Sequence, residues 1–174
     1  DLKLGFALTG NFGMPLNYDE GWVGRYYVQE ATMLGLSLLP TVAYKVSDKV
    51  SVGAGLNAMY GIYKNEVAIN NLNPLFGDGQ LQMQDETWGW GANVGLLFHP
   101  GARHGFGLVR SSQIDLDFSS PLELSNLAPG IEKVLSARGL LDASVNVGIK
   151  VPQGVMLSAY TETSDRWALL GSVG

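Results

Sequence analysis

The chain has no cysteine and little charge, and it contains no long hydrophobic run. Without cysteine it has neither a disulfide framework nor a thiolate nucleophile. No apolar segment approaches the ~18 residues that a membrane-spanning helix requires, which excludes a helical membrane protein. Charged residues make up 16% of the 174 residues, and the net charge is −5. Because nucleic-acid binding favours a basic surface, we expect no nucleic-acid partner.

Residues typical of active sites and metal centres are also scarce. The only two histidines, His99 and His104, flank a turn with Gly and Pro and have no nearby carboxylate, so we expect solvated side chains and no metal site. A serine hydrolase would need Ser, His and a polar orienting group together, and the serine-rich segments are remote from both histidines. The sequence therefore predicts no enzyme activity, no catalytic residue and no cofactor.

Glycine and alternating apolar residues, by contrast, are abundant. Along 33–46 and 51–62 every second residue is mostly bulky and apolar, and the residues between are mostly small or polar. This period of two predicts a long antiparallel hairpin with a tight turn at 47–49, and Pro40 predicts a β-bulge within it. Arms of about thirteen residues match a tilted membrane-spanning strand, whereas soluble strands average about five or six.

The two faces of this hairpin differ from those of a soluble sheet, whose outer face carries charged residues. Here the second face is small and nearly uncharged, which suits a packed barrel interior, while the bulky aliphatic face suits lipid. The pattern favours an all-β transmembrane antiparallel up-and-down β-barrel. A soluble β-sandwich is the alternative, and detergent-free solubility of the complete protein would favour it.

The same alternation continues along the chain and predicts eight strands in total. Tight turns are expected near Ser47, Pro100 and at 151–154, and the long connections are 12–30, 64–86 and 119–141. Tight turns at one end and long loops at the other are typical of an outer-membrane barrel. The short junction at Ser164 is the exception, because parity places it at the long-loop end.

Two further features concern the loops and the ends of the chain. A short helix is expected from Gly130 to Arg138, ended by Gly139, with Ile131 and Leu135 on one face. The chain starts and stops within alternating segments, so we expect residues 1–174 to be the central part of one barrel domain, with targeting information elsewhere.

Several stretches, in this order, resemble the FadL/TodX family of outer membrane transporters for hydrophobic molecules. They are GFALTGNFG (5–13), GRY (24–26), LLPTVAYKV (38–46) running into SVGAGLNA (51–58), WGWGANVG (88–95) and SQI (112–114). The resemblance implies a fourteen-stranded barrel plugged by an N-terminal hatch. This chain would supply eight central strands and lack the hatch and the C-terminal strands.

The resemblance also implies a function. Such a protein would be a monomer in the outer membrane of a Gram-negative bacterium, in contact with outer membrane lipid. It would transport long-chain fatty acids or aromatic and aliphatic hydrocarbons by binding them in an outer-loop groove and releasing them laterally through the barrel wall. A general diffusion porin is the alternative, but it would need charged rings lining its lumen, and the small-residue faces are nearly uncharged.

The site residues follow from the same resemblance. The groove would lie between the loops 64–86 and 119–141, and the lateral opening would lie at a kink around Asn11 and Gly13. Two positions depart from the family pattern: Arg110 stands one residue before the usual arginine, and Val67 replaces a basic residue, which leaves Lys64 as a nearby substitute. A ligand without a carboxylate is therefore an open alternative. The expected ligand-binding residues are Lys64, Leu72, Leu75, Phe76, Leu124, Leu127, Ile131 and Leu135.

Overall fold

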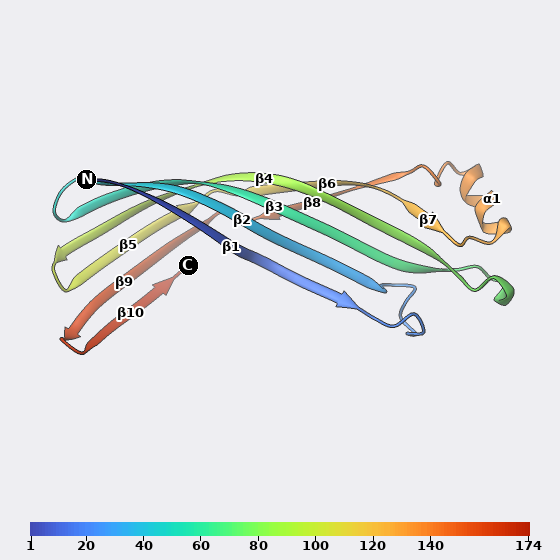
Figure 1. Cartoon of the computed structure of the whole chain (residues 1–174), viewed down its shortest axis with the longest axis horizontal. Helices are drawn as coiled ribbons and strands as arrows, with labels where there is room; N and C mark the ends of the chain where they lie inside the picture. The colour runs from blue at the N-terminus through green and yellow to red at the C-terminus, as the bar shows by residue number, and fades with distance from the viewer.

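The computed structural model describes residues 1–174, apart from the side chain of Pro74. Figure 1 shows long strands in a curved arrangement, with the short helices at one end and the tight turns at the other. No helix in the part of the chain that is described is long and apolar enough to cross a membrane. In chain order the elements are β1 (Leu2–Asn17), β2 (Glu30–Lys45), β3 (Val50–Asn70), the 3-10 helix η1 (Pro74–Phe76), β4 (Asp78–Gly101), β5 (His104–Ser111), β6 (Ile114–Pro121), β7 (Glu123–Ser125), α1 (Pro129–Ala137), β8 (Ser144–Val151), β9 (Gly154–Ser164) and β10 (Trp167–Val173).

The main sheet is antiparallel, with the strand order β1-β2-β3-β4-β5-β9-β10. The short strand β7 pairs with Gln80–Gln82 near the start of β4. The β2–β3 pair is the hairpin that the alternation predicts. The predicted helix is also present as α1, and Gly139 follows it with a φ of +66°, a conformation that favours glycine. The all-β antiparallel fold class is confirmed.

Alternation along the strands gives the sheet two different faces. One face exposes its large apolar side chains, and along β3, β4 and β5 most of the residues between them are half-buried or buried and small. Such a division is expected where each strand contributes alternate residues to opposite faces. The exposed set includes Leu4, Phe6, Leu8, Val42, Val52, Leu56, Trp88, Trp90, Val94, Leu96, Phe98, Phe106 and Leu108.

Pro40 does not produce the predicted bulge. The β2–β3 register is the same on both sides of it, from Leu38 opposite Ala58 to Thr41 opposite Gly55. Proline removes a backbone donor without adding a residue to the strand, so the ladder is interrupted but not shifted.

The turn predicted at 151–154 is wrong. Ser111 of β5 pairs with Gly154 of β9. Three residues after Ser111, Ile114 of β6 pairs with Val151 of β8, which lies three residues before Gly154. The β5–β9 and β6–β8 pairs therefore have the same register. We conclude that β8 and β9 are two parts of one long strand, interrupted at Pro152 because proline cannot donate a hydrogen bond to the ladder. The turn after Ser164 consequently lies with the other tight turns, as Figure 1 shows, and the exception in the predicted connection lengths disappears.

The β6–β8 pair leaves the main sheet and packs across the small-residue face of β3 and β4. Leu116 and Phe118 of β6 are buried there together with Met59 of β3. Glycine makes the approach possible, because a Cβ on Gly89 would lie 2.5 Å from Ile114 Cγ2 and 2.7 Å from the backbone oxygen of Asp115. The prediction that the small-residue face packs against other protein is thus confirmed for this region.

One of the predicted long loops is largely strand, and another begins as one. The β3–β4 ladder continues to the pair of Asn70 and Asp78, so the segment 64–86 is a projecting hairpin. The break expected after Phe12 is also wrong, because β1 pairs with β2 as far as Asn17. In both segments Gly, Pro and polar residues suggested a loop, whereas pairing with a regular neighbour strand maintains the ladder.

Candidate functional site

The candidate site lies at the end of the sheet where the projecting β3–β4 hairpin meets the segment that carries α1. We call residues 70–78 the β3–β4 tip and residues 122–143 the α1 loop. At the tip, Asn73 Oδ1 accepts a hydrogen bond from the backbone N of Leu75 at 3.1 Å and so caps η1. Gly77 reverses the chain with a φ of +66°, which a residue with a Cβ rarely adopts.

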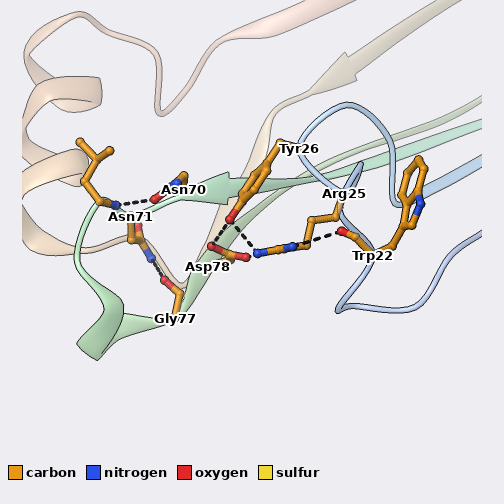
Figure 2. Close-up of polar contacts among 8 residues, drawn as sticks. Trp22, Arg25, Tyr26, Asn70, Asn71, Gly77 and Asp78 are labelled. Atoms are coloured by element: carbon orange, nitrogen blue, oxygen red, sulfur yellow. Dashed lines mark hydrogen bonds and ion pairs between the residues drawn. The ribbon is translucent and has the colours of Figure 1, made fainter.

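Asn71 connects the two segments through its side-chain amide. Its Nδ2 donates to the backbone oxygens of Asn126 at 2.8 Å and Gly77 at 3.0 Å, and its Oδ1 accepts from the backbone N of Ala128 at 2.9 Å. The side chain is almost fully buried, with the residue 4% exposed. Figure 2 shows the bond to Gly77. Sequence reasoning missed this residue, because asparagine in a loop is usually a local turn residue.

A cavity of about 840 Å³ lies beside this junction. Leu124 reaches it from β7, where it pairs with Leu81 of β4, and Leu127 reaches it from the segment held by Asn71. Four leucines and five polar residues, two of them glutamates, share its walls, so a ligand there would meet apolar surface beside polar groups. The lining residues are Gln82, Leu122, Glu123, Leu124, Ser125, Asn126, Leu127, Glu132 and Leu141.

The structure brings only some of the predicted ligand-binding residues together. Leu124 and Leu127 line the cavity, whereas Ile131 and Leu135 lie half-buried on α1 outside its lining. The structure adds Leu122 and Leu141 to the lining. Both lie within the segment 119–141, so their place in that predicted loop could have indicated them. The tip residues Leu72, Leu75 and Phe76 project outward and are 80%, 91% and 52% exposed.

Lys64 lies away from the cavity, on β3. Its Nζ is 2.7 Å from Glu30 Oε2 on β2, so the charge already has a partner. Glu123 and Glu132 supply the charged groups at the cavity itself. Among the described residues, no group of three or more His, Asp or Glu side chains is placed to hold a metal ion.

A charged cluster fixes the connection between β1 and β2 to the same tip. Arg25 Nε donates to Asp78 Oδ2 at 2.7 Å, and the Tyr26 hydroxyl donates to Asp78 Oδ1 at 2.9 Å while accepting from Arg25 at 2.8 Å (Figure 2). The hydrogen bond from Arg25 lowers the pKa of Asp78, and the same bond raises the pKa of Arg25. The bond to the Asp78 carboxylate raises the pKa of Tyr26.

Backbone contacts complete this attachment. The backbone N of Ala68 donates to the oxygen of Arg25 at 2.9 Å, and the N of Gln29 donates to the oxygen of Glu66 at 2.8 Å. The segment 18–29 therefore lies along the β3–β4 hairpin. The segment 18–29, the β3–β4 tip and the α1 loop thus meet at this end of the sheet, and the tip contacts both of the others.

The residues predicted for a lateral opening lie on β1. The β1–β2 register shifts between Gly10 and Phe12, so Asn11 is an extra residue in a β-bulge. Asn11 Nδ2 donates to the fully buried Ser37 Oγ at 2.5 Å. Gly13 pairs regularly with Leu34, so the irregularity is at Asn11.

Comparison with known proteins gives consistent relatives. The whole chain, residues 1–174, matches the family described as outer membrane protein transport protein (OMPP1/FadL/TodX). A long-chain fatty acid transport protein of Escherichia coli is 22% identical over 191 residues, with 95% of this chain and 43% of that protein covered. Outer membrane protein P1 of Haemophilus influenzae is 23% identical over 193 residues, with 95% and 40% covered.

Solved structures agree with the fold. A FadL homologue of Pseudomonas aeruginosa superposes with a TM-score of 0.80 at 17% identity, covering 98% of this chain and 44% of that one. The toluene transporter TodX of Pseudomonas putida gives a TM-score of 0.59 at 12% identity, covering 97% and 49%. The chain thus spans less than half the length of these relatives. Because the family match covers every residue, this chain belongs to the OMPP1/FadL/TodX family of outer membrane transport proteins.

Proposed function

We propose that the full-length protein is an outer membrane transporter of hydrophobic compounds, namely long-chain fatty acids or aromatic and aliphatic hydrocarbons. Family membership supports transport, and the relatives include proteins named for long-chain fatty acids and for toluene. The observation that carries the binding step is the cavity at the outer end of the sheet, where four leucines supply apolar surface among polar residues. The process needs binding and release but no covalent chemistry.

The proposal places the exposed apolar face of the sheet against outer membrane lipid. From Trp88 to Phe98, β4 rises about 33 Å at about 3.3 Å per residue. A strand tilt of about 40° reduces this to about 25 Å, the height of the apolar band of such barrels. Aromatic residues then mark both edges of the band, and the cavity lies beyond the edge at Trp88.

In this arrangement the exposed tip residues Leu72, Leu75 and Phe76 meet the ligand first, and the cavity of about 840 Å³ holds its chain. Each buried methylene contributes about 0.8 kcal/mol. Affinity is therefore expected to rise steeply with chain length.

The binding step is tested with two neighbouring leucines of the full-length protein. Leu141 lines the cavity, whereas Leu140 does not. Leu141→Ser should flatten the dependence of affinity on chain length, and Leu140→Ser should leave it unchanged. Calorimetric titration with saturated fatty acids of increasing length measures both. An affinity that follows head-group charge and ignores chain length would contradict the proposal, and uptake of small hydrophilic solutes would indicate a general diffusion porin instead.

The release step is proposed to pass sideways through the barrel wall beside β1. A hydrophobic molecule released into periplasmic water would lose the transfer free energy that it gained on binding, so leaving into lipid is easier. The bulge of β1 at Asn11 lies near the level of Trp88, because Gly10 pairs with Leu36, Leu36 with Tyr60, and Tyr60 with Trp88.

A further inference from the structure

We propose that Asn71 is a positioning residue that holds the β3–β4 tip and the α1 loop together and so fixes Leu127 at the wall of the cavity. The inference rests on the proposed function, because it concerns the wall of the proposed ligand site. Its observation is separate, however: one buried side chain with three hydrogen bonds joins segments that are 55 residues apart in sequence.

The chemistry of the junction requires a primary amide. Two backbone oxygens, those of Asn126 and Gly77, face Nδ2, and one backbone N–H, that of Ala128, faces Oδ1. Only an amide side chain supplies two donors and an acceptor in this arrangement. Because the residue is buried, an unmatched group at this position would lose its hydrogen bond without regaining one from water.

The junction determines where Leu127 points. The residues on either side of Leu127 are the two that Asn71 binds in the α1 loop. Asn126 has a φ of +54°, in the left-handed region that asparagine adopts more readily than most residues. Leu127 Cδ2 would lie 3.1 Å from a Cβ on Gly79, so this side chain packs directly on the β4 backbone.

Without the bonds of Asn71, the two segments would be joined here mainly by the short β4–β7 ladder of three pairs. The α1 loop would then sample positions in which Leu127 no longer lies on Gly79. The sheet below would keep its ladders, because Asn71 lies outside the strands. The expected effect is a loss of ligand affinity with an unchanged fold.

The test compares two aspartate variants of the full-length protein. Asn71→Asp keeps the acceptor for Ala128 but turns a carboxylate oxygen toward two carbonyl oxygens. Asn73→Asp makes the same charge change two residues away and keeps its one side-chain role, the acceptor for Leu75. Spin labels on Leu75→Cys and Ser136→Cys report the distance between tip and α1 loop, and calorimetry with a saturated fatty acid series reports affinity.

Asn71→Asp should broaden the distance distribution and weaken binding of the longest fatty acid by about tenfold or more. Asn73→Asp should change neither quantity. Heat-dependent gel migration verifies that the barrel is folded, and Asn71→Ala serves if the aspartate variant does not fold. Unchanged distances, or broadened distances with wild-type affinity, would overturn the inference. If the wild-type protein binds no fatty acid, the proposed function fails, whereas the distances still test the junction.

Discussion

Single glycines decide how closely the β6–β8 pair approaches the main sheet. Gly89 and Gly91 of β4 both lie under Ile114, and Gly61 of β3 lies under Phe118. Protein interiors are packed at high density, so even one methyl group matters at such positions. Gly95 of β4 has no such neighbour, because a Cβ there would meet nothing nearer than 3.7 Å.

Gly89→Ala is therefore expected to destabilise the barrel by about 1–3 kcal/mol, the usual effect of overpacking. The new Cβ would lie 2.7 Å from the backbone oxygen of Asp115, which cannot move by a rotamer change. Gly95→Ala is the matched control on the same strand and should have little effect. Urea unfolding of the full-length protein in bilayers measures both, and similar destabilisation by the two variants would show that the β6–β8 pair does not pack as described.

Two of the departures from regular strand pairing have an evident local cause. In β8–β9 it is Pro152, which removes a donor but leaves the register unchanged. In β1 it is the extra residue Asn11, which shifts the register. The bulge also lets Phe12 point inward over Gly35 and pack against the buried cluster of β3 and β6.

Deleting Asn11 is expected to convert β1 into a regular strand. Gly10 and Phe12 already pair with adjacent residues of β2, so the deletion leaves the faces of all other β1 residues unchanged. If ligand leaves beside the bulge, the deletion should abolish uptake of a long-chain fatty acid by cells and retain surface binding. Asn11→Ala, which keeps the extra residue, should retain more uptake. Normal uptake by the deletion variant would exclude release at this position.

Apart from Arg110 of β5, the sheet presents one mostly apolar face across its long strands. In a soluble protein an exposed apolar area of this extent would promote association. In a membrane it is the surface that lipid requires, while the opposite face carries the packed β6–β8 pair. One period of two residues therefore sets both the face that we propose to contact lipid and the opposite, packed face.

Val94→Arg is expected to cost about 2–4 kcal/mol of stability in a bilayer, because it places a charge on the apolar face near mid-strand. Val94 is 55% exposed. Asn93→Arg, one residue away on the opposite face, should cost much less. Reversible unfolding of the full-length protein in lipid vesicles compares the two, and equal costs would show that the assignment of the faces is wrong.

The sequence by itself determined the features that depend on near neighbours. Alternation identified the strands, the two faces and the β2–β3 hairpin, and Gly139 marked the end of α1. These follow from local geometry, since a strand turns successive side chains to opposite faces. The order of several glycine-rich stretches was enough to indicate the family, which the match over the whole chain supports.

The tertiary structure alone decided which segments meet. Arg25 and Asp78 are 53 residues apart, and Asn71 and Asn126 are 55 apart. No local period encodes such contacts. Nor could periodicity distinguish a proline that ends a strand from Pro152, which only interrupts one, because the difference lies in the register of the neighbouring strand. The cavity is therefore a property of strand pairing and long-range hydrogen bonds, and the family resemblance indicated only two of its leucines, Leu124 and Leu127.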